Sequence, residues 1–206
     1  MRGIGLSLRW TSSDTASLIT LFLNVWRSEQ LPWLKKTDCM SDIHIYLPVL
    51  GVFDAVMALL RCNEPTFRLA PYLHPCKIQD GVLFDDGCVR VTAFHNTHMA
   101  ALADEWRSFS FLIESQGKRI VYSGDVKHYE ELDPVIGEGC DALIIETGHF
   151  GIDDVSAYTK SKNIGKVFFN HCGREILNHP AESVSKINQL CGEKAVICFD
   201  GMTEIL

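Results

Sequence analysis

The sequence lacks the cysteine and signal patterns of several protein classes. No two cysteines form a C-x-x-C pair, and the eight cysteines are scattered at wide intervals. We therefore expect neither a zinc finger nor a disulfide scaffold. A secretory signal is not expected either, because a polar stretch ending in Asp14 precedes the first apolar run and no small-residue cleavage site follows that run. Reduced thiols in a cytoplasmic protein are expected from these absences.

Long apolar runs and an excess of positive charge are missing too. Only residues 16–26 resemble a membrane span, and they are roughly half of the ~20 residues that a spanning helix needs. We expect a buried helix there and no membrane partner. The net charge of −7 and the pI near 5.6 disfavour nucleic acid as a partner, because a broad basic surface is absent. No tract is compositionally biased, which argues against a disordered tail or a linker.

What is present is the composition of an ordinary globular chain. Charged residues make up 22%. With 206 residues, of which 47% are hydrophobic, the chain is long enough to bury one core. We therefore expect one domain over residues 1–206. Apolar periodicity predicts helices at residues 14–29, 52–60, 152–161 and 180–190. It predicts strands at residues 42–47, 81–84, 88–94, 108–114, 119–122, 141–146, 166–170 and 195–199.

The order of these elements indicates an α/β fold. Short extended segments dominate the middle of the chain, and Gln116-Gly117 marks a hairpin because glycine accepts the positive φ of a tight turn. Strands and helices alternate over the last third. This order is typical of sheets whose outer faces are covered by helices.

Metal-capable side chains follow the ends of several predicted strands. They are His95 and His98 after residues 88–94, Asp125 after 119–122, Glu146 and His149 at the end of 141–146, and His171 after 166–170. Strand ends meet at one rim of a sheet, so these side chains can share a cleft. Imidazoles and carboxylates are ligands of divalent metals, and a catalytic site leaves a position open for water. A metal that lowers the pKa of water from 15.7 to about 7 supplies hydroxide, which points to hydrolysis.

Five sequence phrases carry a resemblance to the metallo-β-lactamase superfamily over about residues 40–206. They are F-H-N-T-H (94–98), I-V-Y-S-G-D (120–125), D-A-L-I-I-E (141–146), F-F-N-H (168–171) and F-D-G (199–201). The resemblance implies a partial αββα sandwich, with two mixed sheets flanked by helices and the first strands of the fold missing. It also implies a metal-dependent hydrolase that acts on a phosphodiester or another small ester through a metal-activated water.

The resemblance also implies a set of metal ligands. By position, His98 is similar to a ligand of the first metal, Asp125 to the carboxylate that bridges two metals, and His171 to a ligand of the second. The implied cofactor is one or two divalent ions, zinc before others. The implied partner is a small-molecule substrate, favoured over tRNA because no basic arm is present, and a homo-oligomer is compatible with the sequence.

One family motif is absent from this sequence. The family places H-x-H-x-D-H before its first long helix, whereas the matching residues 9–14 contain no histidine. The expectation is either an N-terminally truncated or mis-started reading frame or a degenerate copy, and the sequence leaves both open. In the family the motif supplies four groups, including the aspartate that orients the attacking water, so we expect weak metal binding and poor activity without it.

Each assignment has an alternative. The whole chain could be a non-catalytic protein that uses the fold for binding or assembly. His98 could be an ordinary histidine at the sheet rim, Asp125 a turn residue after glycine, and His171 a satisfied core residue.

Four neighbouring residues are assigned less directly. Side chains alternate at a strand end, so His95 is expected to point away from the ligands. Glu146 and His149 are left open between pocket lining and an ordinary loop. Cys172 lies beside His171 in sequence and is expected to be a small buried hydrophobe rather than a nucleophile.

Overall fold

The computed structural model describes residues 7–9, 43–63, 73–99 and 105–206, which belong to two compact units. The larger unit holds residues 1–14 and 79–206, and the smaller unit holds residues 15–78. The helix predicted at residues 14–29 lies outside the described residues, as do residues 10–14 of the segment that matches the missing motif. The expectation of a single domain stays a prediction.

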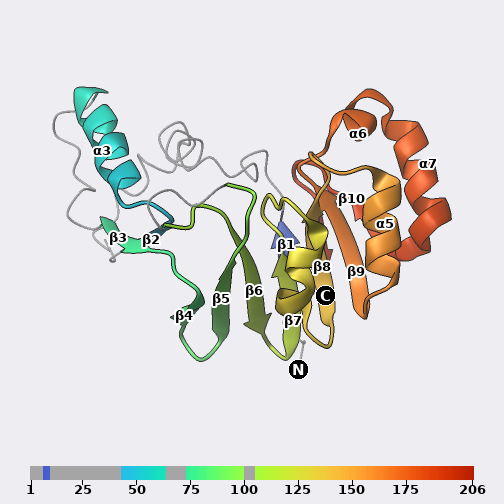
Figure 1. Cartoon of the computed structure of the whole chain (residues 1–206), viewed down its shortest axis with the longest axis horizontal. Helices are drawn as coiled ribbons and strands as arrows, with labels where there is room; N and C mark the ends of the chain where they lie inside the picture. The colour runs from blue at the N-terminus through green and yellow to red at the C-terminus, as the bar shows by residue number, and fades with distance from the viewer. Residues whose placement is uncertain (1–6, 10–42, 64–72, 100–104) are drawn as a thin grey trace. The chain divides into compact units, whose positions relative to one another are not determined.

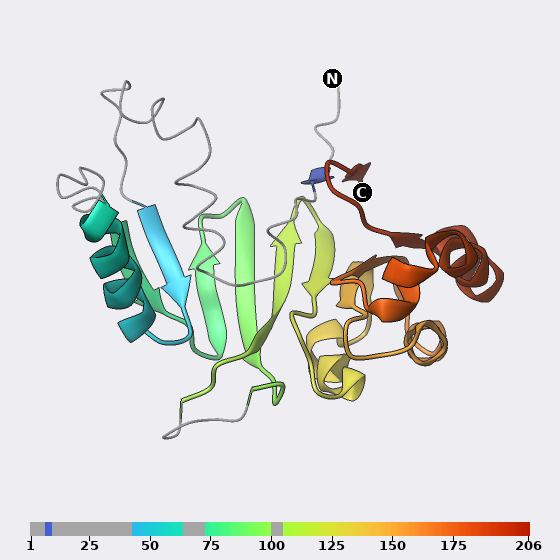
Figure 2. The same cartoon turned by 90° about the horizontal axis from the view of Figure 1, so that it is seen from above.

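The centre of the larger unit is a seven-stranded mixed sheet, seen from two directions in Figures 1 and 2. Its strands are β4 (Gly81–Asp85), β5 (Val89–His95), β6 (Phe109–Ser115), β7 (Lys118–Tyr122), β8 (Cys140–Glu146), β9 (Ile164–Asn170) and β10 (Ala195–Ile197). They lie in the order β10-β9-β8-β7-β6-β5-β4, with parallel pairs from β10 to β7 and antiparallel pairs from β7 to β4. The α/β class with a mixed sheet is confirmed, and every strand predicted between residues 81 and 199 is present.

The hairpin between β6 and β7 turns at the predicted place. Gln116 and Gly117 have φ values of 53° and 76°, and the flanking residues Ser115 and Lys118 are paired. Two successive positive φ values give the backbone twist that a two-residue hairpin loop needs. Glycine adopts this conformation without steric cost, whereas Gln116 does so at some cost.

The central strands of the sheet are buried on both faces. On β8, Leu143 and Ile145 belong to one buried cluster, whereas Ala142 and Ile144 belong to the other. Successive side chains of a strand point to opposite faces, so a strand covered on both sides needs an unbroken apolar run. The phrase D-A-L-I-I-E is such a run.

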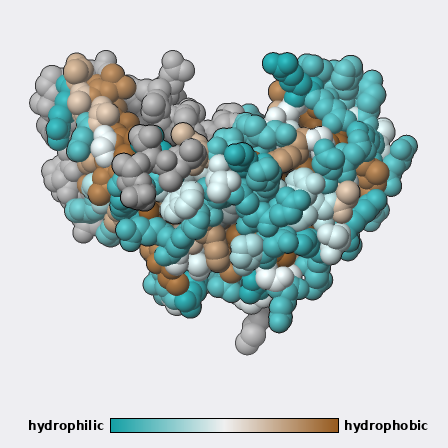
Figure 3. Space-filling model, viewed as in Figure 1, coloured by the Kyte–Doolittle hydropathy of each residue, from teal (hydrophilic) through white to brown (hydrophobic). Residues whose placement is uncertain are grey.

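Helices cover the face that holds the larger cluster. They are η3 (Tyr129–Leu132), α4 (Asp133–Ile136), α5 (Ile152–Lys160), α6 (Arg174–Asn178), α7 (Pro180–Cys191) and η4 (Gly192–Lys194). Helix α5 packs on α7 and on β9, and the visible outer surface over these helices is mainly hydrophilic (Figures 1 and 3). The helices predicted at 152–161 and 180–190 are confirmed. Helices α4 and α6 have four and five residues, which is too short for a helical period to be seen in sequence.

The described part of the smaller unit is a helix with two strands. Strands β2 (Ile43–Leu47) and β3 (Leu73–Lys77) are parallel, and α3 (Gly51–Asn63) lies between them in sequence. The predicted strand and helix are confirmed. Strand β3 was not predicted, because it contains Pro75 and lacks clear alternation; a proline within a strand is typical of a sheet edge.

A short third sheet joins two distant parts of the chain. Strand β1 (Ser7–Arg9) pairs in antiparallel fashion with β11 (Thr203–Ile205) in the larger unit. Within the ranges that the structure describes, no helix has both the length and the apolar character needed to cross a bilayer.

Loss of a phenyl ring should lower the free energy of unfolding much more at a buried position than at an exposed one. Phe169 on β9 is 0% exposed, so Phe169→Ala should lower the free energy of unfolding by about 3–5 kcal/mol. Phe199 is 67% exposed, so Phe199→Ala, the matched control, should change it by less than about 0.5 kcal/mol. Denaturant unfolding of both variants measures this difference. Equal effects would contradict the packing described here.

Candidate metal centre

Four loops bring metal-capable side chains to the same edge of the central sheet. His98 lies after β5, Asp125 after β7, His149 after β8 and His171 after β9. Strands β7, β8 and β9 are parallel, and β5 has the same direction because two antiparallel pairings separate it from β7. The carboxyl ends of all four strands therefore meet at one edge, where sheet proteins of this kind place their ligands.

The side chains themselves lie close together. His171 Nδ1 is 2.8 Å from Asp125 Oδ1, and His98 Nε2 is 3.9 Å from Asp125 Oδ2. Asp125, His149 and His171 each offer one ligand atom within 4.8 Å of the other two. The His149 ring centroid is 4.7 Å from that of His98 and 5.7 Å from that of His171. The structure thus brings the three predicted ligands together and adds a fourth residue, while metal binding itself stays a prediction.

Asp125 is positioned by a turn that requires glycine. Gly124 has a φ of +57°, and a Cβ atom there would lie 2.5 Å from the carbonyl oxygen of Phe109. Only a residue without a side chain fits such a close approach in this conformation. The S-G-D phrase therefore contains a glycine because the chain leaving β7 passes directly against the start of β6.

His171 adopts a backbone conformation that is uncommon for a side-chain-bearing residue. Its φ is +42°. Histidine occurs in this left-handed region more often than bulkier residues, and residues held in such conformations tend to cluster at functional sites. The next turn is tight as well, because a Cβ on Gly173 would lie 2.4 Å from the carbonyl oxygen of Thr147.

A chain of buried hydrogen bonds links three of the four loops, and we call it the serine network. Its members are Asn96, Ser110, Ser123 and Glu146, all of them buried. Asn96 Nδ2 donates to Ser110 Oγ (3.2 Å), Ser110 Oγ donates to the Ser123 carbonyl (2.6 Å), and the Glu146 N–H donates to Ser123 Oγ (3.1 Å). Asn96 Oδ1 also accepts from the His98 N–H at 3.1 Å. The loops that carry His98, Asp125 and His149 are therefore tied together beneath the surface.

Glu131 of η3 holds the loop of His98 from the other side. Its Oε1 accepts hydrogen bonds from the Thr97 N–H (2.9 Å) and Oγ1 (2.5 Å), and its Oε2 accepts from the N–H groups of Lys127 and His128. Partial burial acts to raise the pKa of Glu131, but the hydrogen bonds, led by that from Thr97 Oγ1, outweigh it and lower the pKa below its usual value. The ionised carboxylate is therefore the form that ties the loop.

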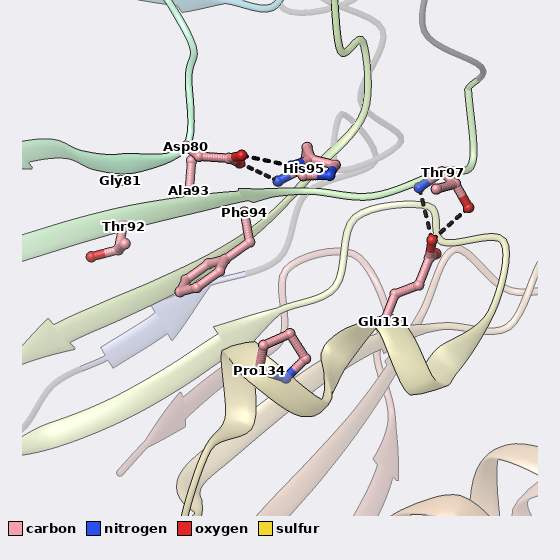
Figure 4. Close-up of a pocket in the computed structure, with 9 residues that line it drawn as sticks. All are labelled: Asp80, Gly81, Thr92, Ala93, Phe94, His95, Thr97, Glu131 and Pro134. Atoms are coloured by element: carbon pink, nitrogen blue, oxygen red, sulfur yellow. Dashed lines mark hydrogen bonds and ion pairs between the residues drawn. The ribbon is translucent and has the colours of Figure 1, made fainter.

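An open cavity of about 440 Å³ lies beside this loop, as Figure 4 shows. It is lined by Asp80, Gly81, Thr92, Ala93, Phe94, His95, Thr97, Glu131 and Pro134. Its volume is in the range of small-molecule pockets. The four metal-capable side chains are not among its lining residues, so this cavity and the candidate metal centre are separate features joined by one loop.

His95 lies apart from the metal-capable group, as expected from strand alternation. Its Nδ1 is 2.6 Å from Asp80 Oδ2, and its ring stacks on Trp106 with centroids 4.0 Å apart. His95 is therefore engaged in a pair of its own at the edge of the cavity.

Glu146 and His149, which the sequence left open, both belong to the site. Glu146 Oε1 is 2.8 Å from His149 Nδ1, and Oε2 accepts from the His149 N–H at 3.0 Å. Glu146 is 1% exposed, whereas the side chain of His149 is 44% exposed. The available signal was a histidine three residues after a carboxylate at a strand end, but the burial of Glu146 could not be read from it.

Cys172 is only partly buried, less than expected, and it packs against the larger apolar cluster. Burial raises the pKa of its thiol above the ordinary value, although a hydrogen bond with Thr147 acts in the opposite direction. Because the thiolate is the nucleophilic form, this environment works against a nucleophilic role.

Comparison with solved structures places the fold among known proteins. YhfI from Bacillus subtilis, a metallo-beta-lactamase fold protein, shares 14% identity with a TM-score of 0.63, over 89% of this chain and 72% of YhfI. Zn²⁺-bound PqqB from Methylobacterium extorquens shares 17% identity with a TM-score of 0.56, over 80% of this chain and 65% of PqqB. A diphosphatase from the PhnP family shares 9% identity with a TM-score of 0.54, over 89% and 66%. At these identities the likeness concerns the fold alone.

The family comparison covers most of the sequence. This chain spans about two thirds of the length of PqqB and of the PhnP-family diphosphatase. No curated protein matches the sequence. A family model described as the beta-lactamase superfamily domain matches residues 30–197, and on this match the chain belongs to the beta-lactamase superfamily.

Proposed function

We propose that this protein is a metal-dependent hydrolase that acts on a phosphodiester or another small ester. The observation that carries the proposal is the position of Asp125, whose two carboxylate oxygens face His171 at 2.8 Å and His98 at 3.9 Å. Two imidazoles and a carboxylate on three strand ends form a donor set that suits zinc. His98, Asp125 and His171 would hold the ion.

The chemistry of the site follows from its position at the surface. When bound, zinc supplies a nucleophilic hydroxide at neutral pH by lowering the pKa of water. The side chains of His98, Asp125 and His171 are all partly exposed, so water and a substrate can reach them. The serine network and Glu131 fix the loops from below, which reduces the reorganisation that binding requires.

Support for the substrate class is indirect. One fold relative is a diphosphatase, which favours a phosphate ester over other esters. A small molecule is favoured over nucleic acid because the net charge is −7. The seven described cysteines are all free, which supports a reducing compartment such as the cytoplasm. A homo-oligomer stays a prediction.

Replacing Asp125 tests the proposal. Asp125→Ala should lower zinc affinity by more than about 100-fold, because it removes a ligand rather than an outer partner, whose loss costs 10–100-fold. Zinc per chain after dialysis and the rate on a chromogenic phosphodiester should fall together. Asp80→Ala is the matched control, because Asp80 also pairs with a histidine but lies outside the group. Unchanged zinc content and rate in Asp125→Ala would favour the alternative, a non-catalytic binding or assembly protein.

The role of Glu131 gives a prediction about pH. Because its pKa is lowered in the folded protein, its contribution to stability is present above the ordinary value of 4.5 and is lost as the pH falls through the folded value. Glu131→Gln should therefore cost about 1 kcal/mol of unfolding free energy at neutral pH and much less in acid. Glu130→Gln, at the exposed neighbouring position, is the control. Denaturant unfolding across pH measures both, and a cost that persists unchanged below the folded pKa would refute this account.

A further inference from the structure

We propose that His149 is a ligand of the metal and that the buried Glu146 is the residue that positions it. The inference rests on the proposed metal-dependent function and deepens it. The metal centre would then include His149 in addition to His98, Asp125 and His171. In this arrangement His149 supplies an imidazole that neither the recognised sequence phrases nor the missing H-x-H-x-D-H motif would supply.

The His149 ring is oriented by its hydrogen bond to Glu146. A carboxylate can only accept hydrogen bonds, so the contact of 2.8 Å with Glu146 Oε1 makes Nδ1 the protonated nitrogen. The lone pair is then on Nε2, on the far side of the ring from Glu146. Histidines that bind metals almost always donate their other ring N–H to a carboxylate, a carbonyl or water in this way.

The ligand atoms of three side chains converge. Asp125, His149 and His171 present atoms within 4.8 Å of one another. Ligand atoms on one tetrahedral zinc ion, at bond lengths of about 2.1 Å, lie about 3.4 Å apart. Movements of less than about 1 Å in each side chain would close the remaining difference, and rotation about side-chain bonds at a partly exposed site allows this.

Glu146 is almost completely buried. A buried carboxylate is costly unless a positive charge or several hydrogen bonds compensate it. Among the described residues its partners are the N–H of Val126 and the N–H and ring of His149, and none of them is a lysine or arginine. A metal ion bound to His149 would supply positive charge one ring away. The burial of Glu146 thus has an electrostatic reason in the metal-bound protein.

Gly148 lets this loop approach His171. A Cβ atom there would lie 3.1 Å from His171 Cε1 and 3.3 Å from Glu146 Oε2. Both distances are tighter than ordinary contacts, so a side chain would push the loop away from His171. The sequence Glu146-Thr147-Gly148-His149 therefore combines the positioning carboxylate, the close approach and the ligand in one turn.

A comparison with His95 separates this arrangement from an ordinary ion pair. His95 and Asp80 make an equally short contact, but their side chains are 37% and 51% exposed. His95 stacks on Trp106 instead of facing other metal-capable groups. The structure thus contains a matched pair of carboxylate–histidine contacts, only one of which faces a cluster of ligand atoms.

The experiment measures zinc affinity by competition with a chelator on the full chain. His149→Ala should weaken binding more than Glu146→Gln, and Glu146→Gln should weaken it about 10–100-fold, the effect of losing an outer partner of a ligand. His95→Ala should leave affinity within about twofold. X-ray absorption of the zinc-loaded protein should count one imidazole fewer in His149→Ala. Removing the ring also takes a hydrogen-bond donor from the buried Glu146, so the metal-free His149→Ala chain should unfold at a lower temperature, and the imidazole count is read on the folded variant.

The outcomes separate the two proposals. Wild-type affinity and an unchanged imidazole count in His149→Ala would overturn the inference, and loss of zinc from His171→Ala in the same series would show that the proposed function survives. Normal zinc binding with slower hydrolysis in His149→Ala would also overturn it, because the histidine would then act on the substrate and not on the metal. A wild-type chain that binds no zinc would instead refute the proposed function itself.

Discussion

The candidate site depends on the buried hydrogen bonds among Asn96, Ser110, Ser123 and Glu146. Each of these polar groups lies in the interior, where an unpaired donor or acceptor would cost roughly 1–3 kcal/mol. Each one is paired with a group on another strand end. The sheet alone would bring the loops to one edge, but the serine network sets their spacing. A site that binds an ion needs this, since ligand distances tolerate only tenths of an ångström.

The same network explains why small residues lie where they do. Ser110 opens β6 beside Phe109, whose carbonyl oxygen leaves no room for a Cβ at position 124. Ser123 uses its carbonyl for Ser110 and its hydroxyl for the Glu146 N–H. A larger residue at position 123 or 124 would separate β6 from the loop of Asp125. In the S-G-D phrase, the serine and the glycine therefore serve hydrogen bonding and packing, and the aspartate is the candidate ligand.

The sequence predicted most of the sheet and part of the site. Strands β4 to β10 carry apolar runs or alternation bounded by turn residues, and these patterns depend only on neighbours in sequence. His98, Asp125 and His171 follow such strands, but so do His95, Glu146 and His149, and the resemblance to the metallo-β-lactamase superfamily singled out the three. Strand β3 and helices α4 and α6 were missed, since a proline or a short length hides their period. The role of Glu146 was left open for another reason: its burial arises from packing between β7 and β9, which no local pattern encodes.

Burial also distinguishes two carboxylate–histidine pairs that have nearly the same contact distance. The contacts Asp80 to His95 and Glu146 to His149 differ by only 0.2 Å, at 2.6 and 2.8 Å. The exposed pair is screened by water and contributes little, whether or not the imidazole is charged. The Glu146 carboxylate is buried and therefore less screened by water, so its negative charge acts more strongly on the His149 ring that it contacts. This difference supports the assignment of the proposed ion to His149 and not to His95, although both histidines have an acidic partner.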